Sequence, residues 1–147
     1  MCDGVAPIAS VLSSRRRGLR VAAARCVWLL SRNNANKSAL FDAEAVPALV
    51  QMLGAEAAAE RQPAMAALWN LSLRSAHCEE IRWQMVGCDI LPALGKVGQA
   101  GEDSATVGLA RKLQAYLEQH AATNATAVRA EPAAVMRSKS GSQVAPR

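Results

Sequence analysis

The sequence predicts an all-α fold built from a repeated helical unit. Hydrophobic residues make up 51% of the 147 residues, but aromatic residues only 3%, and alanine is abundant. Alanine and leucine favour helices, whereas a β-sandwich of this length would carry more Val, Ile, Tyr and Phe. A Trp-x-Leu-Ser motif at Trp28 returns at Trp69, an offset of 41 residues. Because a period of 40 to 45 residues is the size of a two- or three-helix solenoid unit, a helical solenoid is expected.

Proline marks the same period and places the helices. Pro7, Pro47 and Pro92 each precede an apolar run, with spacings of 40 and 45 residues. Proline is tolerated in the first turn of a helix, where its missing N–H is not needed. Three helices are therefore expected to begin there, ending near Ser14, Gly54 and Gly98. The long helices of the three units are predicted at 18–32, 60–73 (with Pro63 in its first turn) and 104–120, and shorter helices at 34–43 and 76–87.

The last 27 residues lose this period. Residues 121–147 are small, polar and basic, and they include prolines. Segments of this composition bury too little apolar surface to order themselves. We expect a disordered basic tail.

Net charge and cysteine content limit the function classes. Residues 1–40 carry a net charge of +6, residues 41–120 carry −4, and residues 121–147 carry +3. This uneven distribution fits a binding surface better than a uniformly basic nucleic-acid domain. The four cysteines have no CxxC spacing and no sign of secretion accompanies them, so we expect free thiols and a cytoplasmic location, with the nucleus as the alternative. No apolar run reaches the length of a membrane span.

Three segments resemble the armadillo repeat family. AALWNLS, LLSRNNANKSALFDAEAVPALVQML and GVAPIASVL carry the family pattern in one frame. The resemblance implies a right-handed α-solenoid of three-helix repeats, with about eight helices in residues 1–120. The leading repeat, 4–32, is partial, and 33–73 and 74–120 are full repeats.

The chain departs from the family pattern at two places. Glu44 and Asp89 stand where a glycine usually precedes the proline helix, so the helix break needs another solution, and Asp tolerates a positive φ better than Glu. The stretch from Ser72 to Pro92 is four residues longer than its counterpart in the preceding unit. We expect the short helix at 76–87 to be one turn longer.

The resemblance also implies a peptide-binding face, since the long helices of stacked repeats line a concave surface. Family members that bind nuclear-import signals use a Trp and an Asn four residues apart. Here only the Asn is present, as Asn70, with Ala66 at the Trp position, so a nuclear-import signal is disfavoured. The matching positions give four candidate partner-binding residues: Arg25, Asn70, Lys112 and Tyr116.

These candidates favour an acidic, extended peptide. An amide both donates and accepts hydrogen bonds to a peptide backbone, and cations bind carboxylates through charge-assisted bonds. The alternatives are that Asn70 bonds a neighbouring loop and that Arg25 and Lys112 are solvated. Trp28 and Trp69 are expected to be packing residues.

A basic patch is formed by Arg15, Arg16, Arg17 and Arg20. Such a turn can contact nucleic acid, anionic lipid or an acidic partner. No aromatic residue is interleaved with the arginines, and Gly18 marks a loop, so a solvated turn is the competing interpretation.

No enzyme signature is present in the sequence. Neighbouring residues on a helix point about 100° apart, so His77, Cys78, Glu79 and Glu80 cannot chelate one metal ion, and no second ligand pair has zinc-like spacing. We therefore expect a non-enzymatic protein-interaction module without metal or cofactor, whose partner is a protein or peptide. The alternatives are a piece of a longer armadillo array or a self-assembling scaffold, and, more weakly, an adaptor to nucleic acid or membrane surfaces.

Overall fold

The computed structural model describes the backbone of residues 4–142 and the side chains of residues 4–126. This range contains eight α-helices and no strand, which confirms the predicted fold class. The helices are α1 Val5–Val11, α2 Arg17–Leu30, α3 Asn34–Asp42, α4 Ala45–Leu53, α5 Ala58–Ser72, α6 Cys78–Gly87, α7 Ile90–Val97 and α8 Ser104–Ser142.

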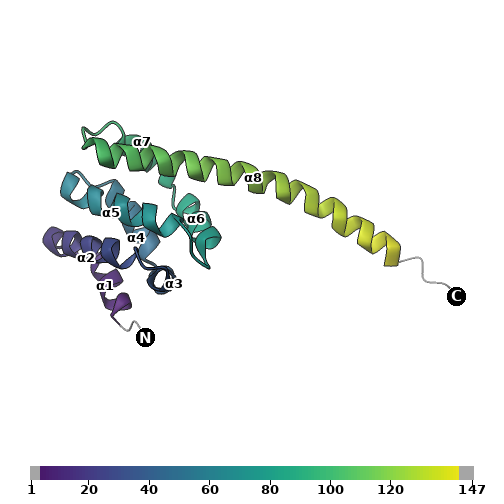
Figure 1. Cartoon of the computed structure of the whole chain (residues 1–147), viewed down its shortest axis with the longest axis horizontal. Helices are drawn as coiled ribbons and strands as arrows, with labels where there is room; N and C mark the ends of the chain where they lie inside the picture. Colours follow the sequence, from purple (N-terminus) through teal and green to yellow (C-terminus); the bar gives the residue numbers. More distant parts are fainter. Residues whose placement is uncertain (1–3, 143–147) are drawn as a thin grey trace. The chain divides into compact units, whose positions relative to one another are not determined.

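The chain divides into two compact units, residues 1–114 and 115–147, and α8 begins in the first unit and continues into the second. In the first unit the long helices α2 and α5 lie side by side (Figure 1) and make the most extensive helix–helix contact. Helix α4 packs against α5 and also contacts α6 and α7. Each long helix is thus backed by shorter helices, as a helical solenoid requires.

The core of the first unit lies between the long and the short helices. Its fully buried side chains are mostly aliphatic. The residues with no more than 2% exposure include Ala24, Val27, Leu40, Leu49, Leu53, Met65, Leu68, Leu71, Ile81, Met85, Ile90, Leu94 and Leu113.

The leading helix α1 is covered by the helices that follow it. Leu12 is only 2% exposed, and Ile8 and Val11 are half-buried. Helices α2, α3 and α4 all contact α1 and provide this cover.

Two acidic residues make the helix breaks that glycine makes elsewhere. Glu44 precedes α4 with φ 56°, and Asp89 precedes α7 with φ 57°. Both lie in the left-handed region, which is costly for a residue with a Cβ atom. The chain therefore keeps the sharp turn of the pattern without its glycine, and Glu44 is the more strained of the two because Asp tolerates this region better.

The four additional residues after Ser72 are placed differently from the prediction. Helix α6 has 10 residues against 9 in α3, so it is longer by one residue rather than by one turn. The other three residues lengthen the connection between α5 and α6. This connection is held by side chains from other elements: Lys37 Nζ donates to the Leu73 carbonyl at 2.7 Å, and Arg82 Nε donates to the Ser72 carbonyl at 3.0 Å.

Two predicted helix boundaries also need correction. Helix α5 begins at Ala58, so Pro63 lies inside the helix rather than in its first turn. Helix α8 continues past His120, where we expected it to end, and runs to Ser142. The alanines that follow His120 support a helix by intrinsic propensity alone. The predicted disorder of residues 121–147 stays a prediction, and its last five residues lie outside the described residues.

Candidate partner-binding site

A hollow of about 330 Å³ lies between α2, α5 and the first turns of α8. Its floor is apolar and is formed by small or rigid side chains from α5 together with one alanine and one leucine from α8. Its rim carries Arg25 and Trp28 from α2, and Gln62 and Asp103 from the opposite side. The floor residues are Ala59, Pro63, Ala66, Ala105 and Leu109, with Thr106 beside them.

Trp28 lies on the rim of this hollow and is 40% exposed. The sequence favoured a packing role, and for this residue that role stays a prediction. Trp69, its counterpart 41 residues later, is half-buried and comes closer to the packing role.

Arg25 is the one residue of the four candidates that lines the hollow. Its side chain is exposed, and among residues 4–126 it has no hydrogen bond or ion pair. Its charge is therefore available to an incoming anion. Lys112 is also exposed on α8 but does not line the hollow.

Asp103 closes the other side of the hollow and is fully engaged. Its Oδ1 accepts the backbone N–H of Thr106 at 2.9 Å, and its Oδ2 accepts the Thr106 hydroxyl at 2.7 Å and Gln62 Nε2 at 2.9 Å. The hydrogen bond from the Thr106 hydroxyl, with that from its amide, lowers the pKa of Asp103 below its ordinary value. The carboxylate therefore stays charged, so the hollow is basic at α2 and acidic at α8.

Asn70 plays a structural role. Its Nδ2 donates to Ser31 Oγ at 3.1 Å and, more weakly, to the Trp28 carbonyl at 3.5 Å, which ties α5 to the end of α2. This is close to the competing interpretation, in which Asn70 bonds a neighbouring segment. Among residues 4–126 its side-chain oxygen has no partner, so an acceptor remains.

A second hollow, of about 540 Å³, adjoins Asn70 at the C-terminal ends of α2 and α5. It brings together three cations, Arg32, Lys37 and Arg74, and no carboxylate lines it. Lys37 is buried, and burial lowers the pKa of its ammonium below the ordinary value. Its hydrogen bonds to the Leu73 and Arg74 carbonyls compensate part of the cost of burial. The sequence analysis missed these three residues because they come from different elements.

Tyr116 lies in the second unit. Its side chain is half-buried and takes part in an interaction with another residue. Its role as a partner-binding residue stays a prediction.

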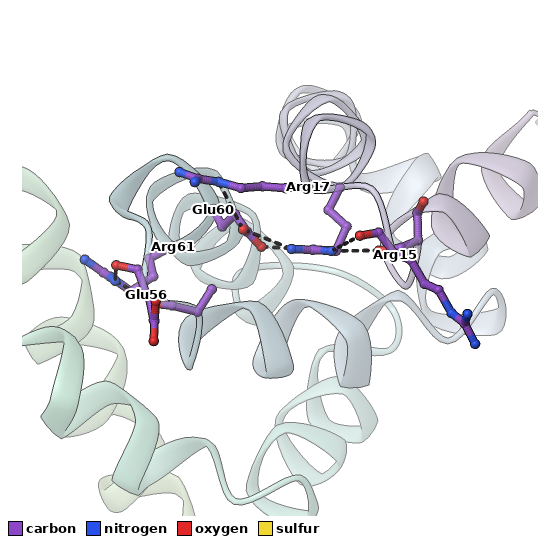
Figure 2. A network of polar contacts seen from close by, with 8 residues as sticks. Arg15, Arg17, Glu56, Glu60 and Arg61 are labelled. Atoms are coloured by element: carbon purple, nitrogen blue, oxygen red, sulfur yellow. Dashed lines mark hydrogen bonds and ion pairs between the residues drawn. The ribbon is translucent and has the colours of Figure 1, made fainter.

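The basic patch is partly used inside the fold. Arg20 donates from Nε and Nη2 to the two carboxylate oxygens of Glu60, each at 3.0 Å, and from Nη1 to the carbonyls of Ser14 and Arg15. The hydrogen bond to Glu60 raises the pKa of Arg20. Arg17 reaches the same carboxylate at 3.4 Å (Figure 2). Arg15 and Arg16 stay exposed, so the available patch is smaller than the sequence suggested.

The Arg20 contacts recur 41 residues later. Arg61 Nη1 donates to the carbonyls of Ala55, at 2.6 Å, and Glu56, at 2.5 Å, and its guanidinium pairs with the buried carboxylate of Glu102. Figure 2 shows Arg61 beside Glu56. In the first two repeats an arginine in the first turns of the long helix holds the preceding turn and pairs with a glutamate of the next repeat. The offset of 41 between Arg20 and Arg61 was the sequence signal for this ladder.

Comparison with known families agrees with this architecture. A family model described as armadillo/beta-catenin-like repeat matches residues 33–73. This chain contains an armadillo repeat. The match covers α3, α4 and α5, the segment with the Asn70 and Arg61 contacts. No curated protein matches this chain.

Armadillo repeats are generally protein-interaction modules, and their family is typically non-enzymatic.

Among the described residues no group of three or more His, Cys, Asp or Glu side chains could hold a metal ion. His77 stacks on Phe41 with ring centroids 6.0 Å apart. In the part of the chain that the structure describes, no helix combines the length and the apolar character needed to cross a membrane.

Proposed function

We propose that this armadillo chain is a non-enzymatic module that binds an extended, acidic segment of a partner protein in the hollow between α2, α5 and the start of α8. The observation that carries the proposal is an apolar floor of about 330 Å³ beside the unpaired Arg25. An apolar side chain of the segment occupies the floor, against Ala66 and Leu109. A neighbouring carboxylate pairs with Arg25 in a charge-assisted bond.

The charges of the rim orient the segment. Asp103 repels carboxylates at the α8 side, so the acidic residue lies toward α2. Trp28 supplies an exposed ring beside Arg25, and aromatic and arginine side chains are the usual anchors of protein interfaces. Lys112 and the side-chain oxygen of Asn70 extend the surface, and Tyr116 remains a candidate by its repeat position.

Peptide selection tests the proposal. A random peptide library displayed on phage is selected on the chain and then assayed against R25E and R111E. Both arginines are exposed, but Arg111 does not line the hollow. Selected peptides should carry acidic residues beside an apolar one and lose about tenfold or more of their affinity for R25E, as expected for a charge-assisted contact. Peptides that bind R25E with the same affinity as the unchanged chain would show that the hollow is not the binding site.

The alternative of a longer array or a self-assembling scaffold is favoured by apolar side chains exposed on α2. Light scattering tests it directly, since a monodisperse monomer at high concentration contradicts self-assembly. The adaptor alternative is weakened because Arg20 and Arg17 pair with Glu60. The cytoplasmic location, with the nucleus as alternative, stays a prediction that imaging of the tagged chain would check.

A further inference from the structure

Helix α2 carries an apolar stripe that nothing in the described structure covers. Leu19 is 46% exposed and Leu29 57% exposed, and Ala22 and Cys26 between them are also exposed. The spacing of three, four and three residues places all four side chains on one face of the helix. Of the four large hydrophobic side chains exposed among the described residues, three lie on α2. A contiguous exposed apolar surface of this kind marks an interaction site.

The repeat shows what this stripe is. An offset of 41 residues carries its four members onto α5, where the equivalent residues pack against α2. Glu60 pairs there with Arg20, Asn70 donates to Ser31, and the two residues between them are buried. The equivalent positions on α5 are Glu60, Pro63, Ala67 and Asn70. The stripe is therefore the surface through which a long helix stacks on a preceding helix, and on α2 that surface is open.

Charge decides which occupant fits the stripe. Residues 4–41 contain seven Lys and Arg and no acidic residue. Leu19 stands where α5 has Glu60, and Arg15 and Arg16 lie exposed just before it. A preceding repeat of the kind seen here would bring an arginine, the counterpart of Arg20 and Arg61, to a place without a carboxylate. A second copy using the same face would oppose two arginine clusters. Like charges disfavour both occupants.

We propose that the outer face of α2 docks an amphipathic helix of a partner protein whose apolar stripe covers Leu19, Cys26 and Leu29. Acidic residues at the edge of that helix pair with Arg15 and Arg16. This is recognition of a helix by an apolar surface with basic borders. It uses the open face of α2 that is equivalent to the face with which α5 packs on α2, and it does not depend on the peptide hollow.

Two synthetic helical peptides test this docking by fluorescence anisotropy with the full chain. Both carry leucines at the stripe spacing, and they differ only in flanking glutamates or flanking lysines. The Glu peptide should bind at least about tenfold more tightly than the Lys peptide, and added salt should reduce the difference. Absence of binding by the Glu peptide, or equal binding of both, overturns the proposal.

Matched variants locate the docking surface. L19Q/L29Q should weaken the Glu peptide by about tenfold or more, because two buried leucines are lost from the contact. W83Q removes the exposed large hydrophobic side chain that lies on α6 instead of α2, and it should leave binding unchanged. Equal weakening by W83Q and L19Q/L29Q contradicts the assignment. Analytical sedimentation measures whether the chain forms a dimer. If it does, and if L19Q/L29Q is a monomer, the stripe binds a second copy of the chain and the proposed acidic helix is wrong.

Discussion

Helices α2 and α5 are the equivalent long helices of two successive repeats, and they have different neighbours. Both carry the Trp-x-Leu-Ser motif, and in both the serine hydroxyl donates to the carbonyl of the tryptophan three residues earlier, at 2.7 Å. Both use an arginine to hold the preceding turn. Yet Ala67 on α5 is fully buried, whereas Cys26 at the same place on α2 is exposed. The comparison shows that the repeated sequence determines the local hydrogen bonds of a long helix. The burial of its side chains depends on whether another helix packs on it.

The largest effect on the free energy of unfolding is expected from placing a charge at Ala67, compared with the same change at the equivalent residue Cys26. A67D places a charge in the α2–α5 interface and should lower the free energy of unfolding by more than about 3 kcal/mol, because a buried unpaired carboxylate is very costly. C26D, at the equivalent exposed place, should change it by less than about 0.5 kcal/mol. Urea denaturation followed by circular dichroism measures both. Equal losses would mean that the outer face of α2 is buried in solution.

The second comparison is between the two arginines of the ladder. R61A leaves the carboxylate of Glu102 buried without its partner, since Arg61 and Glu102 side chains are 10% and 0% exposed. A loss of about 3 kcal/mol is expected. R20A should cost less, because Arg20 is 25% exposed and water reaches the turn. In R61A/E102Q much of the loss should return. A smaller loss in R61A than in R20A would reverse the order that burial predicts.

A smaller, stabilising effect is expected at the two left-handed residues. E44G should raise the free energy of unfolding by about 1 kcal/mol, since glycine adopts positive φ without a steric penalty. D89G should gain less, because Asp tolerates this region better than Glu. Thermal denaturation of the two variants against the unchanged chain gives the ranking. A larger gain for D89G would show that side-chain contacts, rather than backbone strain, decide stability at these turns.

The smallest effect concerns the pH dependence contributed by Lys37. Burial lowers its pKa in the folded chain, so the unfolded chain binds the proton more tightly. The resulting destabilisation is present below the folded pKa and disappears as the pH rises toward the unfolded value. The stability of K37M relative to the unchanged chain should therefore fall as the pH rises through this alkaline window. A pH-independent difference between the two would show that Lys37 titrates normally.

The sequence by itself determined the repeat and most of the helices. The offset of 41 residues and the three prolines placed seven helices close to their observed positions, because local patterns of apolar residues and helix-breaking residues act within one unit. The sequence marked Glu44 and Asp89 as departures from glycine, but the expected different solution to the helix break was wrong, since both residues keep the left-handed turn. The sequence signal failed at helix ends: Pro63 lies deeper in α5 than expected, and α8 passes His120.

Only the tertiary structure decided which of the candidate residues face solvent. Arg20 and Asn70 hold one repeat to the next, while Arg25 is unpaired and Trp28 lines a hollow. Equivalent residues of two repeats have the same local pattern, so the sequence alone cannot rank their exposure. Exposure depends on which neighbouring helix supplies cover and on which side chains from distant turns supply a partner. For this chain that information resides in the contacts of α2 with α5.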